Sequence, residues 1–149
     1  MKEDEFRLYR GKLPHWRMER SVYFVTWRLG QGQADLTPAE RGVVAEALRH
    51  FHNTRYRLAG YVIMNDHVHV VVEPENGHRL EAIVHSWKSF TAHRFARTGS
   101  RTGSVWQREY FDRILRSELE MAEKLQYVLD NPWRRWPEIE DYAWLWMAE

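Results

Sequence analysis

The chain has 149 residues, the size of one ordinary domain with a sizeable core, and we expect a single unit over residues 1–149. It has no cysteine, which excludes disulfides, thiolate metal sites and thiol catalysis. It also lacks an apolar run of about 18 residues and the apolar centre of a signal peptide, so we expect a cytoplasmic protein with no membrane partner.

The net charge of +1 does not by itself indicate an acidic partner. The chain is rich in arginine, however, and it contains 8 tryptophans. Arginine binds phosphate through two parallel hydrogen bonds, and tryptophan stacks on unpaired bases. Composition therefore permits nucleic-acid binding, although tryptophans also fill cores.

Residues 1–20 form a basic lead-in arm in our interpretation. Arg10, Trp16 and Arg17 are its candidates for contacts with phosphates and bases. A solvated tail explains the same composition equally well.

The core, residues 21–132, is expected to contain four strands, because β-branched and aromatic residues are concentrated in four segments. These segments are 21–29, 55–64, 66–73 and a stretch near 110–115. With three helices between and after them, the order is β-α-β-β-α-β-α. This order predicts an α+β fold of the ferredoxin-like, split βαβ type, an antiparallel sheet with two helices on one face and an added C-terminal helix.

Two amphipathic helices are expected between the strands. The first begins at the N-cap Thr37, with Pro38 next and Glu40 in the capping-box position. The second covers 79–97, and its apolar side includes Phe90.

The third helix is expected to begin after the cap Ser117, to run to about Asn131 and to end before Pro132. The tryptophan-rich tail, residues 133–149, has no clear hydrophobic period.

The stretch 61–73 contains the strongest chemical signal, a pair of histidines two residues apart on an apolar strand. His67 and His69 leave the same face of this strand, while Val68 and Val70 leave the other. Neutral imidazole is a common metal ligand, so the pair indicates a divalent metal. The alternative is a pair of hydrogen-bonded structural histidines, and the motif alone does not separate the two.

A second pair lies on the last helix. Tyr127 and Asn131 are four residues apart and therefore share a face of this helix. A packing tyrosine and a helix-terminal asparagine explain the pair by itself. Together with the histidines, however, it supplies a nucleophilic hydroxyl and an amide oxygen.

Three segments resemble the single-tyrosine HUH transposases, and most closely their REP-associated branch. They are DHVH at 66–69, WQREYFDR at 106–113 and YVLDNP at 127–132. The motifs occur in the family's order, and the resemblance covers about 21–132. It implies the ferredoxin-like fold and a transposase that cuts single-stranded DNA at hairpin-forming repeats.

The resemblance also implies roles for four residues. His67 and His69 match the metal-binding histidines, and Tyr127 matches the nucleophile that forms a 5′-phosphotyrosine. Asn131 matches the third ligand position for Mg²⁺ or Mn²⁺, where mobile relatives have glutamine, which is longer by one methylene.

Other residues have two explanations each. Trp106 and Gln107 are candidate DNA contacts, with Trp106 stacking on a hairpin base or packing in the core. Arg113 reaches DNA or forms an ion pair with Asp112.

Asp66 and Glu73 orient an imidazole or have turn and strand-end roles. His85 and His93 are expected at the surface.

We therefore expect a metal-dependent single-strand endonuclease and strand transferase. The alternatives are a hairpin-binding module that does not cleave DNA and a phosphodiesterase without a covalent intermediate. A plain interaction domain with a structural histidine pair is the remaining alternative. The expected partner is single-stranded or hairpin DNA, and the sequence leaves monomer and homodimer open.

Overall fold

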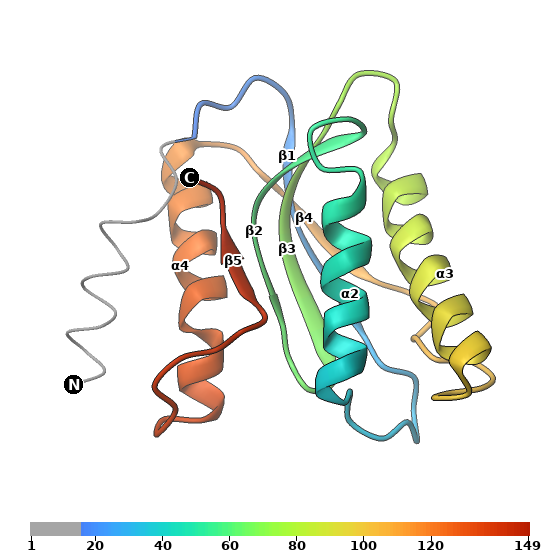
Figure 1. Cartoon of the computed structure of the whole chain (residues 1–149). Coiled ribbons are helices and arrows are strands. Elements are labelled where there is room, and N and C mark those ends of the chain that lie inside the picture. Colours follow the sequence, from blue (N-terminus) through green and yellow to red (C-terminus); the bar gives the residue numbers. More distant parts are fainter. Residues whose placement is uncertain (1–15) are drawn as a thin grey trace.

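The structure is a computed structural model that describes residues 16–149 (Figure 1). The predicted strands and helices are all present, and each boundary lies within a few residues of its expected position. The elements are β1 (Val22–Arg28), α2 (Pro38–His50), β2 (Tyr56–Ile63), β3 (His67–Pro74), α3 (Leu80–Thr98), β4 (Phe111–Leu115), α4 (Glu118–Arg135) and β5 (Leu145–Met147).

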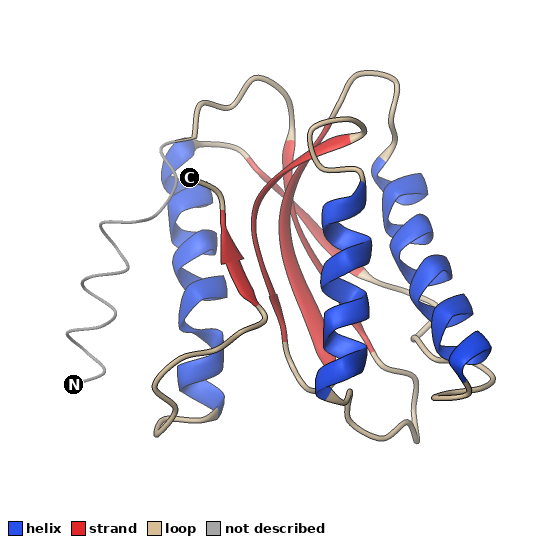
Figure 2. Ribbon diagram, in the orientation of Figure 1, coloured by secondary structure: helices blue, strands red, loops and turns tan. Residues whose placement is uncertain are grey.

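One antiparallel sheet in the order β4-β1-β3-β2-β5 organises the described residues. Helices α2 and α3 pack on one face, and α4 covers the other (Figures 1 and 2). The first four strands have the ferredoxin-like order, so the predicted α+β fold is confirmed. The strand that carries the histidine pair, β3, is central, as expected.

The sheet separates two apolar cores, because successive strand residues point to opposite faces. Val25, Trp27, Val68 and Val70 face α2 and α3, while Phe24 belongs to the cluster that packs against α4. The α4 side also receives His67 and His69, which alternate with the valines of β3. No helix among residues 16–149 combines the length and the apolar character needed to cross a bilayer.

The predicted start of α2 is confirmed. The Thr37 side chain accepts a hydrogen bond from the Glu40 amide, and the Glu40 carboxylate accepts one from the Thr37 amide. Ser117 caps α4 in the same way, but the Glu120 carboxylate accepts from the amide of Arg116 instead of that of Ser117.

The predicted end of α4 is wrong. The helix continues through Pro132 to Arg135. Proline removes one amide donor, but its own carbonyl still accepts a hydrogen bond from the Trp136 amide. Trp133 is buried with 4% exposure, and its burial holds this last turn against the rest of the protein.

Two further expectations need correction. Phe90 is 40% exposed and lies beneath the guanidinium of Arg94 instead of in the core. The tail contains a short strand, β5, which adds to the sheet beside β2. Its three residues are too few to show a period, and only the neighbouring strand explains why they are extended.

The end of the lead-in arm is bound to the sheet. Glu73 is fully buried and accepts hydrogen bonds from the amides of Glu19 and Arg20. Its other oxygen lies 3.0 Å from the guanidinium of Arg57, which also covers the ring of Trp16. Of the two roles predicted for Glu73, orientation of an imidazole and a structural role at the strand end, the structure shows the second.

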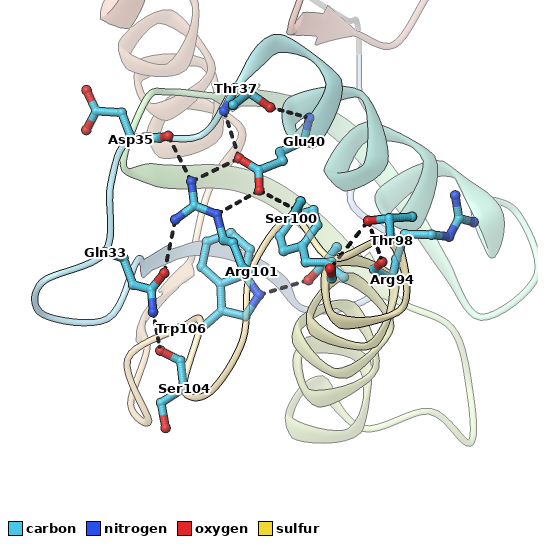
Figure 3. Close-up of polar contacts among 12 residues, drawn as sticks. Gln33, Asp35, Thr37, Glu40, Arg94, Thr98, Ser100, Arg101, Ser104 and Trp106 are labelled. Atoms are coloured by element: carbon cyan, nitrogen blue, oxygen red, sulfur yellow. Dashed lines mark hydrogen bonds and ion pairs between the residues drawn. The ribbon is translucent and has the colours of Figure 1, made fainter.

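A buried ion pair joins α2 to the segment after α3 (Figure 3). Arg101 donates to both carboxylate oxygens of Glu40, at 2.7 and 2.9 Å, and also to Gln33 and to the Asp35 carbonyl. Burial alone would raise the pKa of the Glu40 carboxyl, but hydrogen bonds from Arg101, from the Thr37 backbone and from Ser100 outweigh it. The pKa falls from 4.5 to about 2.

We expect Glu40→Gln to lower the free energy of unfolding at pH 7 by about 3 kcal/mol, because it leaves Arg101 buried without its counter-charge. The folded-state pKa is depressed, so this contribution is complete above about pH 4.5 and is lost as the pH falls towards about 2. Urea unfolding of both proteins across this range measures it. The control Glu46→Gln removes an exposed ion pair with Arg94 and should cost less than about 1 kcal/mol. A difference that does not shrink on acidification would contradict the assignment.

Candidate functional site

The register between β1 and β3 builds the site. Thr26 lies opposite His69, and Arg28 lies opposite His67. The two imidazole rings are 4.7 Å apart between centroids, on the face of the sheet that α4 covers. Both histidine side chains therefore point to the same face of the sheet, as predicted.

Each imidazole is held through its Nδ1 atom. His67 Nδ1 lies 2.6 Å from Asp66 Oδ1, and His69 Nδ1 lies 2.6 Å from Thr26 Oγ1. These contacts leave both Nε2 atoms to bind a ligand, the arrangement that oriented metal-binding histidines adopt. Of the two roles predicted for Asp66, orientation of an imidazole and a turn role, the structure shows the contact that orients His67. Thr26 was missed, because the sequence does not show which β1 residue faces His69.

His69 is in the protonation state that a metal ligand needs. It is 4% exposed, and the pKa of its imidazole is lowered to about 3. Burial is the largest cause, and the electrostatic effects of His67, Arg28 and Lys124 act in the same direction. The ring is consequently neutral near pH 7, so one of its two nitrogens has a lone pair for a ligand.

Tyr127 lies beside the histidines on α4. Its ring contacts His69 at 5.4 Å and Phe24 at 5.9 Å between centroids, both edge to face. Phe24 in turn stacks on His69 at 5.3 Å. These contacts fix the half-buried phenol next to the imidazole pair. The structure therefore brings the predicted nucleophile and the two predicted histidine ligands together.

Two cations cover the tyrosine ring. Lys124 Nζ lies 5.3 Å from the ring centroid, and Arg134 Cζ lies 4.9 Å from it. Neither side chain forms an ion pair with another residue of the described part of the chain. Their charge is thus available to an anionic ligand at Tyr127. Lys124 is three residues before Tyr127, so helix spacing could have indicated it.

Asn131 is one turn beyond the tyrosine and is 9% exposed. Its amide nitrogen donates to the Tyr127 carbonyl at 3.3 Å, which leaves the amide oxygen as the atom for a metal. Among residues 16–149, no three His, Cys, Asp or Glu side chains are grouped to hold a metal ion. A metal at His67 and His69 would therefore take further ligands from the amide of Asn131, water or substrate.

A cleft of about 520 Å³ opens in front of Tyr127 and His69. Thr26 and Arg28 line it from β1, and Gln107 and Phe111 line it from β4 and the segment before it, which pair with β1. Phe111 is 57% exposed, unusual for such a large apolar ring. The cleft has the aromatic and cationic groups that bind unpaired nucleotides.

The segment before β4 extends the sheet beside the end of β1. The Gln107 amide donates to the Arg28 carbonyl, and the Gly30 amide donates to the Val105 carbonyl at 2.7 Å. A side chain at Gly30 would lie 2.9 Å from the Ser104 carbonyl, so only glycine allows this approach. The pairing positions Gln107 at the cleft. Its side chain is exposed there, so DNA in the cleft could reach it, as predicted.

Trp106 points into the core. It is 7% exposed, and its indole nitrogen donates to Thr91 at 2.8 Å. The core position was one of its two predicted alternatives, and a stacking contact with a hairpin base does not fit this burial.

The other candidates lie farther from His69. Arg113 is exposed in a second hollow on the far side of Tyr127, and Glu120, not Asp112, is its nearest acidic partner at 3.9 Å. Trp16 is covered by Arg57, and Arg17 is exposed at the same end of the sheet as Glu73.

His85 and His93 are exposed on α3, as expected. Arg10 lies outside the described residues.

The sequence model of the family described as "Transposase IS200 like" matches residues 39–131, more than half of the chain. The chain belongs to the IS200-like transposase family. The match includes His67, His69, Tyr127 and Asn131, and it confirms the resemblance found in the sequence. Transposases are enzymes that process DNA. No curated protein matches the chain significantly.

Solved structures of transposases share the fold of this family member. A REP-associated tyrosine transposase, solved bound to a REP hairpin, has a TM-score of 0.72 at 15% identity and covers 89% of this chain and 79% of its own. A putative transposase from Deinococcus radiodurans has a TM-score of 0.56 at 19% identity, with 78% and 95% covered. At identities of 15% and 19%, these similarities show a shared fold and nothing more.

We expect the imidazole of His69 to remain neutral over the pH range in which an ordinary histidine, with a pKa of 6.5, becomes charged. Burial is the main reason, since it disfavours the charged form. Two-dimensional ¹H–¹⁵N NMR of the metal-free protein measures the titration, with the signal assigned by its absence in His69→Gln. A midpoint near 6.5 for that signal would contradict the buried arrangement.

Proposed function

We propose that this transposase is a metal-dependent single-stranded DNA endonuclease and strand transferase that acts at hairpin-forming repeats through a 5′-phosphotyrosine. The observation that carries the proposal is the contact between the rings of Tyr127 and His69, which puts the phenol beside an oriented imidazole pair. Membership in the IS200-like family supports DNA as the substrate. The fold neighbour bound to a REP hairpin supports a hairpin as the partner.

The donor set fits a divalent cation. His67 and His69 would hold it through Nε2, with the amide oxygen of Asn131 as a further ligand, and nitrogen and oxygen donors suit Mn²⁺ or Mg²⁺. When bound, such an ion withdraws charge from the phosphate oxygens and favours attack on phosphorus.

Tyr127 performs the covalent step. Its Oη forms a bond to the scissile phosphorus, and the bond from phosphorus to the 3′ oxygen breaks. The phenolic proton ends on the released 3′-hydroxyl, so the exchange needs no water and no external energy source. Because one phosphodiester replaces another, the 3′-hydroxyl of a second strand can reverse the reaction. Cleavage and rejoining are thus one chemistry.

The residues around the ring prepare this step. Phe24 and His69 hold the phenol by ring contacts, and Lys124, one turn before it, and Arg134, two turns after it, place positive charge over the ring. A phosphodiester at Tyr127 would meet these cations, which stabilise the charge that develops on the phosphoryl oxygens. The exposed ring of Phe111 offers a stacking face to an unpaired base.

We expect Tyr127→Phe to abolish the protein–DNA adduct, because it removes only the attacking oxygen and keeps the ring contacts. A labelled hairpin with single-stranded flanks, Mn²⁺ and a denaturing gel provide the measurement. Tyr23→Phe is the matched control, since Tyr23 lies on β1 outside the cleft and should leave the adduct unchanged.

Cleavage that persists in Tyr127→Phe would identify a phosphodiesterase without a covalent intermediate. Binding without cleavage by the unmodified protein would identify a hairpin-binding module.

We expect Thr26→Val to weaken Mn²⁺ binding about 10- to 100-fold, the usual cost of removing the group that orients a ligating histidine. Valine keeps the volume and removes the oxygen that contacts Nδ1 of His69. Electron paramagnetic resonance of free Mn²⁺ measures the affinity. Thr98→Val, at the exposed end of α3, is the control. Equal affinities for both variants would show that Thr26 does not orient a ligand.

A further inference from the structure

A second groove lies along α3, on the other side of the segment that carries Gln107. It has a volume of about 740 Å³ and is bounded by α3, by 103–108 and by the loop after β1. Its polar lining consists mainly of histidines, serines and two cations, Lys88 and Arg108. We propose that this groove binds the phosphodiester backbone of the DNA whose neighbouring nucleotides occupy the Tyr127 cleft, an inference that rests on the proposed function.

The charge of the lining supports an anionic occupant. Among the five cavities described within residues 16–149, this groove alone has no Asp or Glu in its lining. His85 and His93 are exposed on its α3 side, and Ser89 and Ser104 add hydroxyl groups. Basic and hydroxyl side chains are the groups that contact phosphate oxygens in protein–DNA complexes.

Lys88 is held in place for such a contact. Its Nζ donates to the Gln107 carbonyl at 2.7 Å and to the Arg108 carbonyl at 3.0 Å. An ammonium has three N–H donors, so one remains for a ligand. Burial lowers the pKa of Lys88, and an anion beside the ammonium would oppose that shift. Within residues 16–149, the Arg108 guanidinium has no ion-pair partner.

The groove and the Tyr127 cleft are neighbours. Gln107 lines both cavities, and its amide is hydrogen-bonded to the carbonyl of Arg28 on β1. A strand that leaves the cleft across Gln107 would therefore reach the groove. A path of this kind lets one DNA molecule occupy both cavities.

Side-chain hydrogen bonds hold the groove wall to the loop after β1 and to α2. Arg101 connects the 99–106 segment to Glu40 and Gln33, and Gln33 donates to the Ser104 carbonyl at 3.0 Å (Figure 3). A preformed wall reduces the ordering cost of binding. The buried ion pair thus supports the groove as well as the fold.

Hairpin affinity of groove variants tests the proposal. We expect Arg108→Ala to weaken binding of a flanked hairpin about tenfold, the cost of one charge-assisted hydrogen bond. The slope of log K against log salt should fall by about 1. Lys88→Ala should act similarly, and Arg108→Ala is the cleaner variant because Lys88 also bonds the loop backbone. Fluorescence anisotropy in EDTA measures both quantities without cleavage.

Arg79→Ala is the matched control, because Arg79 is 83% exposed at the other end of α3 and lines a different cavity. It should change neither affinity nor slope. The rate of adduct formation should also be the same in Arg79→Ala as in the unmodified protein, because Arg79 lines neither the groove nor the Tyr127 cleft. A hairpin without flanks and a flank without hairpin show whether the stem or the single strand occupies the groove.

Unchanged affinity and salt slope in both Arg108→Ala and Lys88→Ala would overturn the proposal. This outcome is distinct from failure of the proposed function, which the absence of an adduct in the unmodified protein would show. The binding measurement needs neither metal nor cleavage, so a reduced affinity and slope support the groove in either case.

Discussion

The antiparallel register between β1 and β3 is the constraint on which the site depends. It sets Thr26 opposite His69, so that a threonine hydroxyl holds one imidazole while Asp66 holds the other. A shift by one residue would turn the histidines towards α2 and α3 and bring valines to the α4 face. Burial of those valines in a separate core therefore fixes the same register that the chemistry requires.

Helix α4 completes the site because it packs on the face opposite to α2 and α3 (Figure 1). Its apolar residues close the second core, and the same packing presses Tyr127 against Phe24 and His69. Stability and chemistry share these contacts. Mutations that loosen α4 should consequently affect the nucleophile before they affect the histidine pair.

The edge of the sheet at β4 links two cavities. The close approach at Gly30 and the buried pair of Glu40 and Arg101 hold the 99–107 segment beside β1. This segment separates the Tyr127 cleft from the groove along α3, and Gln107 faces both. A charged pair far from the tyrosine thus shapes the proposed path of the DNA.

The sequence by itself determined the strands and helices, their order, the caps of α2 and α4, and the pairing of histidines with a tyrosine. The elements and caps follow from local periodicity and capping chemistry, and the histidines and the tyrosine were joined through the family resemblance of the separate motifs at 66–69 and 127–132. Tertiary structure alone decided that Thr26 and Arg134 join the site, that Trp106 is buried and that β5 extends the sheet. Such features depend on contacts between residues distant in the chain, and local sequence does not specify which partners meet.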